Sequence, residues 1–222
     1  IVMCPGKEDM FNFLEDVVRE VVPLFPGKYF HIGGDECPKT SWKNCPTCQK
    51  RIEAEGLQAD GKHSAEERLQ SYVIKRMEKM LAKYDRKIIG WDEILEGGLS
   101  PDATVMSWRG TSGGISAALQ KHDVIMTPGS GGLYLDHYQG DYKIEPVTIP
   151  SAPAYLSRTY NYEPVPDTIK SLGLEKHILG VQCNNWSEYM YTNAKMEYQM
   201  YPRSLALAEI AWSPAKKKNF TD

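Results

Sequence analysis

The stretch Lys28-Tyr29-Phe30-His31-Ile32-Gly33-Gly34-Asp35-Glu36 shows most clearly how this chain folds and where its polar chemistry lies. Tyr-Phe-His-Ile is a short aromatic and β-branched run, typical of a strand. Two glycines end the run, so Asp35 and Glu36 follow at the carboxyl end of that strand. Adjacent carboxylates disfavour each other's ionisation, and a carboxyl group that keeps its proton near neutral pH can act as a general acid. A solvated acid pair in a turn is the alternative interpretation.

Four further apolar runs share this plan, in which a short strand leads into aromatic or polar residues. They are KIIGWDE at 87–93, TVMSWRG at 104–110, HDVIMTP at 122–128 and ILGVQCNNWSE at 178–188. Apolar residues at helical spacing lie between and around them, at 9–25, 49–55, 64–84, 113–121 and about 195–212. The helix at 64–84 begins with Ser64 and Glu67 in the spacing of a capping box. Short strands alternating with helices indicate a parallel sheet covered on both faces.

The positions of the polar residues favour one α/β architecture over another. In a (β/α)8 barrel the functional residues surround a ring at the carboxyl ends of the strands, whereas an open doubly wound sheet has its site at one switch point. Aromatic or acidic residues at every strand end favour the barrel. A complete barrel has eight strands in about 250 residues. We therefore expect residues 1–222 to be the C-terminal portion of a single barrel domain, with residues 1–5 as the end of a further strand.

The composition is that of an ordinary globular protein, with 41% hydrophobic and 25% charged residues. A net charge of -3 and a pI near 6.0 provide no basic field for a polyanion, so nucleic acid is not an expected ligand. No apolar run approaches the roughly 20 residues of a membrane span. The first residues do not resemble a signal peptide. We interpret the chain as starting within a domain, and the compartment therefore cannot be inferred from its beginning.

Five cysteines, an odd number, do not form a regular disulfide framework. Cys37, Cys45 and Cys48 fall within twelve residues, and the last two have C-x-x-C spacing. The chain has neither a second C-x-x-C nor a paired His-x-x-x-His, either of which would complete a zinc motif. Free thiols in a loop are the default expectation, and a disulfide or a metal site stays open as an alternative.

Five motifs, taken together and in chain order, resemble glycoside hydrolase family 20, the β-N-acetylhexosaminidases. They are HIGGDE at 31–36, GWDE at 90–93, SWRG at 107–110, YLD at 134–136 and WSE at 186–188. The family fold is a (β/α)8 TIM barrel, and the matching segments resemble its fourth to eighth strands. In that register the first three strands are absent, together with the arginine, aspartate and histidine that they supply to the sugar site in the family.

The resemblance implies an exo-acting, retaining β-N-acetylhexosaminidase that removes terminal β-linked N-acetylglucosamine or N-acetylgalactosamine. The nucleophile in this family is the 2-acetamido oxygen of the substrate, which forms an oxazolinium intermediate. By the same resemblance, Glu36 would protonate the leaving oxygen and then activate water. Asp35 would hold the acetamido N–H, and Tyr134 would donate a hydrogen bond to the acetamido oxygen.

The resemblance also assigns the residues that bind the sugar. Trp91, Trp108 and Trp186 match the aromatic pocket around the acetamido methyl group and the sugar face. Asp136 and Glu188 match positions that bind the outer hydroxyl groups. No cofactor and no metal ion is implied.

Structural roles are the alternative for several of the same residue types. A tryptophan taken alone is more often a core aromatic, and the position directly after a strand is what favours the site. Trp42 and Trp212 lack that position, so we expect them to pack. His31 lies inside the strand and is expected to be structural.

Partners, location and competing functions follow from the same comparison. The expected partner is a glycan with a terminal N-acetylhexosamine, and self-association through the open edge of the barrel is a further expectation. A periplasmic, extracellular or lysosomal location is implied by the family alone. An inactive carbohydrate-binding or scaffold fragment is the main alternative, and a barrel glycosidase with its own nucleophile is a third. The fragment alone is expected to be weakly active or inactive.

Overall fold

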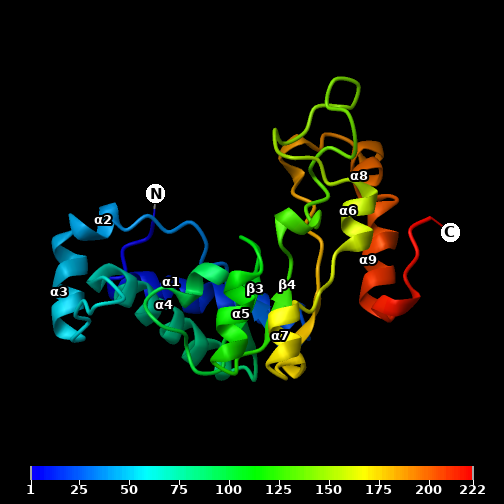
Figure 1. The fold of residues 1–222 in the computed structure, drawn as a ribbon. Coiled ribbons are helices and arrows are strands. Elements are labelled where there is room, and N and C mark those ends of the chain that lie inside the picture. Colours follow the sequence, from blue (N-terminus) through cyan, green and yellow to red (C-terminus); the bar gives the residue numbers. More distant parts are fainter. Residues whose placement is uncertain (1, 222) are drawn as a thin grey trace. The chain divides into compact units, whose positions relative to one another are not determined.

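The computed structural model describes residues 2–221 and divides into two compact units, Ile1–Val105 and Met106–Asp222. The division falls inside strand β3 (Thr104–Ser107). The first unit contains, in order, α1 (Glu8–Val21), η1 (Val22–Leu24), β1 (Tyr29–His31), α2 (Thr40–Lys43), α3 (Pro46–Ala54), α4 (Ala65–Ala82), β2 (Lys87–Trp91) and η2 (Asp92–Leu95) (Figure 1).

The second unit follows β3 with a longer series of short elements. They are α5 (Ser112–Leu119), β4 (Val124–Met126), η3 (Gly129–Gly131), α6 (Leu156–Asn161), α7 (Asp167–Ser171), η4 (Glu175–His177), β5 (Ile178–Val181), η5 (Ser187–Tyr189), α8 (Asn193–Met200), α9 (Arg203–Trp212) and η6 (Ala215–Lys217). Strands therefore alternate with helices, as the sequence predicts.

The strands follow sequence order, β1-β2-β3-β4-β5, in one sheet. In the first unit β1 pairs in parallel with β2, and Phe30 lies opposite Ile88. In the second unit β4 pairs in parallel with β5, with an irregularity between Val124 and Ile125. The five predicted strands are confirmed at the expected places. Residues 1–5 were expected to end a further strand. Residues 2–5 have no strand structure, and Ile1 lies outside the described residues.

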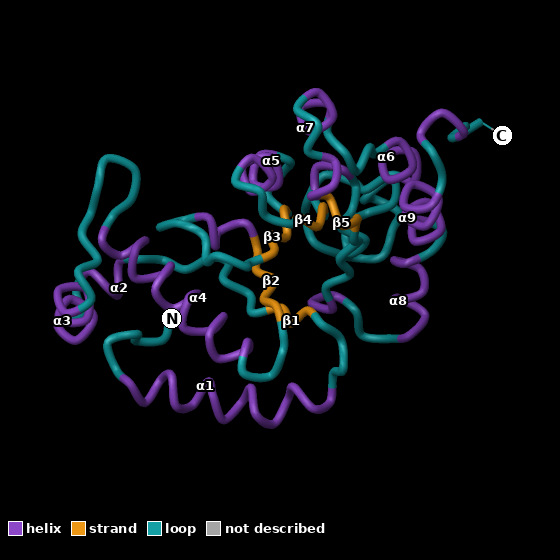
Figure 2. The backbone as a smooth tube through the Cα atoms, turned by 90° about the horizontal axis from the view of Figure 1, so that it is seen from below, coloured by secondary structure: helices purple, strands orange, loops and turns teal. Residues whose placement is uncertain are grey.

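Helix α4 covers the sheet of the first unit. Ser64 accepts a hydrogen bond from the N–H of Glu67, and the Glu67 carboxylate accepts one from the N–H of Ser64, which confirms the capping box. The apolar face of α4 buries Leu69 and Leu81 completely. The helix packs against β2 on one side and against α1 on the other (Figure 2).

The end of the second unit differs from the sequence prediction. One helix was expected at about 195–212, but α8 ends at Met200 and α9 begins at Arg203. Pro202 explains the break, because proline has no N–H to donate within a helix and its ring would clash with the carbonyl group four residues earlier. The short helices α6 and α7 were not predicted, since segments of five or six residues are too short for a periodic pattern.

Two expectations concern surfaces and membranes. No helix among residues 2–221 is long and apolar enough to cross a bilayer. Strand β1 is at one end of the strand order within the described part of the chain. Self-association through this edge stays a prediction.

Gly90 in β2 provides a test of how closely the strand packs. A Cβ atom at Gly90 would lie 2.6 Å from Cγ2 of Ile94 and 3.1 Å from the carbonyl oxygen of Gly33. We expect Gly90→Ala to lower the free energy of unfolding by about 1–3 kcal/mol, because the buried Ile94 must shift. Gly180 in β5 is the matched control, since a Cβ atom there meets nothing within 4 Å. Gly180→Ala should change stability by less than about 0.5 kcal/mol in the same urea titration. Equal losses in the two variants would contradict this account of the packing.

Candidate active site

The backbone turns sharply between β1 and the acid pair. Gly33 and Gly34 have φ angles of 73° and 96°, a region that other residues rarely adopt. Glu36 has a φ of 44°. A non-glycine residue in this region costs on the order of 1 kcal/mol or more, and such strain concentrates at functional sites. The local geometry therefore supports a functional role for Glu36, whose side chain is exposed, as is that of Asp35.

Gln70 of α4 joins the segment after β1 to the segment after β2. Its side chain is buried, and Nε2 donates to the carbonyl oxygen of Glu93 at 2.9 Å and to that of Gly34 at 3.4 Å. Leaving a buried amide without a hydrogen bond would lower the stability of the fold. These contacts therefore fix the two segments relative to each other.

Lys39 extends this network beyond the acid pair. Its ammonium group donates to the carbonyl oxygen of Cys37 at 2.9 Å, to the Glu96 carboxylate at 2.8 Å and to Oε1 of Gln70. Lys39 and Glu96 are both partly shielded from solvent, which limits screening of the ion pair. The backbone after Glu36 is thus fixed by side chains that no sequence motif singled out.

Trp91 is the last residue of β2, and its ring contacts His31. The two ring centroids are 4.7 Å apart, and Nδ1 of His31 accepts a hydrogen bond from the N–H of Gly33 at 3.1 Å. Partial burial lowers the pKa of His31 below its ordinary value, and the negative charge of Asp35 opposes that shift. These contacts agree with the structural role that we expected for His31.

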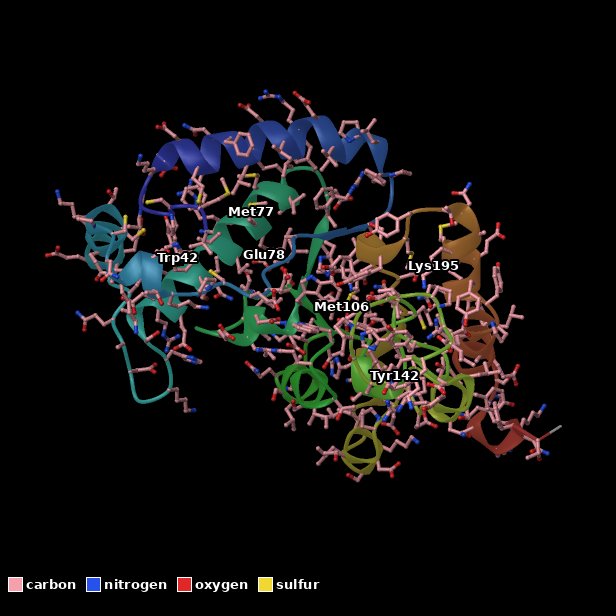
Figure 3. All side chains as sticks on the ribbon, turned by 90° about the horizontal axis from the view of Figure 1, so that it is seen from above. Trp42, Met77, Glu78, Met106, Tyr142 and Lys195 are labelled. Atoms are coloured by element: carbon pink, nitrogen blue, oxygen red, sulfur yellow. The ribbon has the colours of Figure 1, made fainter. Side chains whose placement is uncertain are left out.

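A cavity of about 380 Å³ in the first unit is lined by Asp35 and Glu36 together with apolar side chains of α1 and α4. Met77 of α4 and Trp42 of α2, both labelled in Figure 3, also line it. Trp42 is 5% exposed, which confirms its predicted packing role. Trp91 does not line this cavity. The acids are therefore accessible from a mainly apolar hollow, while Trp91 packs on His31.

In the second unit the structure brings Trp108 and Tyr134 together. Their rings are nearly parallel, with centroids 6.4 Å apart and an interplanar angle of 16°. Tyr134 is held beside Asn184 because Leu135 N–H donates to the Asn184 oxygen at 2.7 Å and Asn184 N–H donates to the Leu133 oxygen at 2.8 Å. The indole and the phenol therefore stack on each other, and both side chains are only partly buried.

Asp136 is only 1% exposed, and neither carboxylate oxygen has a well-formed hydrogen bond within residues 2–221. Burial raises the pKa of Asp136 above its ordinary value. The nearby charge of His137, the backbone N–H of Trp186 and the charge of Arg203 oppose that rise. A buried carboxylate without well-formed hydrogen bonds lowers the stability of the fold.

Arg203 of α9 holds the backbone on both sides of Asp136, and the sequence did not predict this role. The fully buried guanidinium donates to backbone oxygens of Leu135, His137, Ala154 and Gln199. Burial lowers its pKa to about 10. Arginine in an apparently apolar helix is the signal that could have indicated a buried contact, since arginine is almost never fully buried unless it is paired.

The remaining predicted residues lie nearer the surface. Trp186 is 48% exposed, and Glu188 in η5 is exposed as well. Asp92 and Glu93, for which the sequence suggested no definite role, are buried at the start of η2. The expectation that Trp212 packs in the interior is wrong, because its side chain is 89% exposed. It is the last residue of α9, and the packing argument rested on residue type alone.

Comparison with known proteins gives a consistent picture. The profile described as "Glycosyl hydrolase family 20, catalytic domain" matches residues 1–215. A beta-hexosaminidase of Porphyromonas gingivalis is 58% identical over 100% of this chain and 27% of its own length. A beta-hexosaminidase of Vibrio furnissii is 36% identical over 93% of this chain and 33% of its own length.

Solved structures agree with the sequence comparison. The exo β-N-acetylglucosaminidase of family 20 from Vibrio harveyi, solved in complex with N-acetylglucosamine, superposes with a TM-score of 0.89 at 31% identity. The match covers 100% of this chain and 34% of that one. The chain thus spans between a quarter and about a third of the length of these three relatives.

Parallel strands that alternate with helices, with acids and aromatic rings after their carboxyl ends, define an α/β protein built as part of a (β/α)8 barrel. The predicted fold class is therefore confirmed. This chain belongs to glycosyl hydrolase family 20. The expectation that 1–222 is one domain portion stays a prediction.

The electrostatic contact between Asp35 and His31 can be measured directly. We expect Asp35→Asn to lower the pKa of His31 further, because the carboxylate is the group that favours the imidazolium form. The matched control is Glu36→Gln, which removes the neighbouring charge but should leave the pKa of His31 in place. An NMR titration of the His31 ring in the two variants and the wild type separates these outcomes. A rise of the His31 pKa in Asp35→Asn would contradict the assigned geometry.

Asp136 allows a test of the cost of its burial. Its pKa is raised in the folded state, so the wild type loses stability as the pH rises from the ordinary carboxyl range through the folded-state pKa. Asp136→Asn does not titrate, and we expect it to gain about 1 kcal/mol relative to the wild type at pH 7. The gain should disappear below about pH 4. Urea titrations at several pH values check this, with the exposed Asp141→Asn as the control, and a gain that persists in acid would be inconsistent with burial as its cause.

Proposed function

We propose that the protein to which this chain belongs is an exo-acting, retaining β-N-acetylhexosaminidase that uses the 2-acetamido group of its substrate as the nucleophile. The observation that carries the proposal is the acid pair Asp35-Glu36, held in a strained turn at the end of β1 in a chain of family 20. The names of the relatives, beta-hexosaminidase and exo β-N-acetylglucosaminidase, support the class of substrate.

Each acid has a distinct role in the proposed reaction. Glu36 donates its proton to the glycosidic oxygen as the bond to the leaving group breaks, and the acetamido oxygen attacks the anomeric carbon from the other side. Asp35 accepts a hydrogen bond from the acetamido N–H and offsets the positive charge that develops on the oxazolinium ion. In the second half of the reaction, the Glu36 carboxylate takes a proton from water as that water attacks the anomeric carbon.

The residues of the second unit act on the sugar without exchanging covalent bonds. Tyr134 donates its hydroxyl hydrogen to the acetamido oxygen and so orients the internal nucleophile, a proximity effect worth several kcal/mol in well-oriented systems. The stacked, partly exposed rings of Trp108 and Tyr134 are proposed to contact the sugar and its acetamido methyl group. Trp91 and Trp186 are proposed to complete the aromatic pocket.

Asp136 is suited to binding a sugar hydroxyl group, with Glu188 as a second acceptor. The carboxylate of Asp136 is buried and lacks a well-formed hydrogen bond within the described residues, and a hydroxyl group would supply the donor. The mechanism calls for no cofactor or metal ion, since both proton transfers are assigned to Glu36. The substrate is proposed to be a glycan with a terminal β-linked N-acetylglucosamine or N-acetylgalactosamine.

Glu36→Gln tests the proposal when it is introduced into the whole protein to which this chain belongs, since the chain alone is expected to be weakly active or inactive. Loss of a positioned general acid should reduce kcat for an aryl β-N-acetylglucosaminide by about 10²–10⁴-fold, because proton donation to the leaving oxygen is lost. Binding of a thiazoline analogue of the oxazolinium ion should remain in the variant, measured by calorimetry. The matched control is Glu20→Gln, an exposed acid on α1, which should behave as the wild type.

The same measurements separate the competing functions. Wild-type protein that binds N-acetylglucosamine but never turns over the aryl glycoside would favour a carbohydrate-binding role. Turnover without inhibition by the thiazoline would favour an enzyme nucleophile. Turnover that is unchanged in Glu36→Gln would end the assignment of the general acid.

A further inference from the structure

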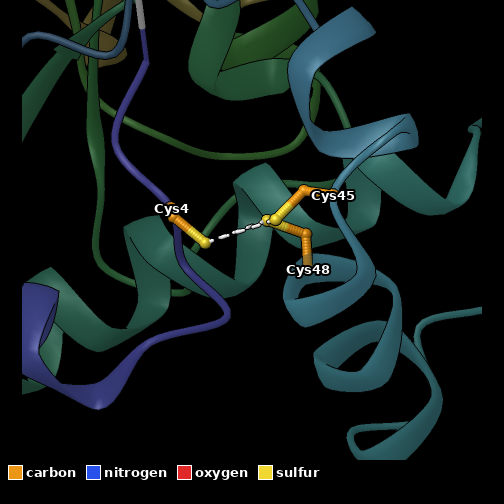
Figure 4. Close-up of side chains that lie close together, drawn as sticks. All are labelled: Cys4, Cys45 and Cys48. Carbon is orange, nitrogen blue, oxygen red and sulfur yellow. Dashed lines mark hydrogen bonds between the residues drawn. The ribbon is translucent and has the colours of Figure 1, made fainter.

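Three cysteines from two distant segments of the first unit meet at one point (Figure 4). Sγ of Cys4 lies 3.4 Å from Sγ of Cys48 and 3.6 Å from Sγ of Cys45, and all three sulfur atoms lie within 4.8 Å of one another. The sequence singled out Cys45 and Cys48, but Cys4 was not part of that group. Its position 41 residues earlier gave no spacing signal.

The backbone around the sulfur atoms is built for this approach. Cys45 is the residue before α3, and Cys48 lies in its first turn, after Pro46 at the first helical position. A Cβ atom at Gly6 would lie 2.4 Å from the carbonyl group of Thr47, so only glycine lets the Cys4-Pro5-Gly6 segment reach the start of α3. Trp42 fixes the same segment, because its Nε1 donates to the oxygen of Met3 at 2.9 Å.

The distances match those of a metal–thiolate cluster. Zinc–sulfur bonds of about 2.3 Å in a tetrahedral site place the ligand sulfur atoms about 3.8 Å apart. The observed 3.4 and 3.6 Å separations are close to that value. A disulfide would join only two of the three sulfur atoms and would not explain why the third lies beside them. One cation bound by all three sulfur atoms explains their common position.

The surroundings favour a soft cation. The cluster lies at the edge of a small apolar core formed by Trp42, Cys48, Ile52 and Leu69, and Cys48 is completely buried. Backbone N–H groups of Thr47 and Cys48, in the first turn of α3, donate to the sulfur of Cys45, so this sulfur atom lies at the positive end of the helix. Thiolate ligands select Zn²⁺ over hard cations such as Mg²⁺ or Ca²⁺.

We propose that Cys4, Cys45 and Cys48 bind one Zn²⁺ ion through three thiolates, with the fourth position taken by a water molecule. Binding releases the thiol protons to solvent as the three sulfur–zinc bonds form. The ion ties the segment before α1 to the start of α3. Helix α3 lies in a loop-rich insertion at 38–61, which follows Asp35 and Glu36 in the chain. Its role is structural, and it takes no part in the proposed chemistry of the acids.

Metal content and spectroscopy test the proposal on the full 222-residue chain, purified under reducing conditions. We expect about one Zn²⁺ per chain after equilibration with ZnSO4 and removal of free metal. Substitution by Co²⁺ should give thiolate-to-cobalt charge-transfer bands and the strong visible bands of tetrahedral cobalt. Cys4→Ser should weaken Zn²⁺ binding on the order of 100-fold, because one of three thiolates is lost. Cys183→Ser, in the second unit, and Cys37→Ser, whose sulfur lies outside the cluster, should keep the ion.

A second measurement keeps the test independent of whether a variant folds. Alkylation of the wild-type chain, mapped by mass spectrometry, should show that Zn²⁺ protects Cys4, Cys45 and Cys48 but not Cys37. A wild-type chain that retains no Zn²⁺ overturns the proposal. So does a disulfide within the cluster in protein kept under reducing conditions, and loss of the ion in Cys37→Ser would overturn the three-thiolate assignment.

Discussion

The side chain of Ile94 determines where the backbone of the candidate site can carry side chains. Cβ atoms at Gly34 and Gly90 would lie 2.7 and 2.6 Å from Cγ2 of Ile94, so this one methyl group occupies the space that both glycines leave. The two glycines belong to different motifs, one after β1 and one inside β2. Ile94 is completely buried and leaves no room for a side chain at either position. The residues just before the acid pair and just before Trp91 must therefore be glycines.

Burying the polar residues that support the site lowers the stability of the fold unless they form hydrogen bonds. The two units differ in how far those hydrogen bonds are made. In the first unit Gln70 and Lys39 make enough hydrogen bonds to satisfy their polar atoms while they fix the turn that carries Glu36. In the second unit the two terminal nitrogens of Arg203 donate to backbone oxygens, but its Nε and both carboxylate oxygens of Asp136 lack well-formed hydrogen bonds within the described residues. A satisfied network stabilises the fold, whereas a buried carboxylate without well-formed hydrogen bonds lowers its stability.

The sequence predicted the strands, the capping box and the residues after each strand, because these features depend on local pattern and chain order. The turn acids and Trp108, Tyr134 and Trp186 could be located in this way. Gln70, Lys39 and Arg203 could not, since their partners are backbone oxygens brought near only by tertiary packing. The break at Pro202 was readable from the residue itself, and the expectation of one helix gave too much weight to periodicity. Cys4 illustrates the same limit, because contact across 41 residues leaves no trace in local spacing.

The insertion after the acid pair connects these observations. The strained turn that carries Glu36 must be held by the residues around it, because the αL conformation of Glu36 would otherwise relax. Lys39 supplies one contact two residues beyond Cys37, and the packing of Trp42 supplies a second. The cysteine cluster lies directly after these contacts in the chain, where a further tie between α3 and the start of the chain restricts the same loop. Fixing the turn therefore depends on contacts spread over the whole insertion, and the acids alone could not maintain their own geometry.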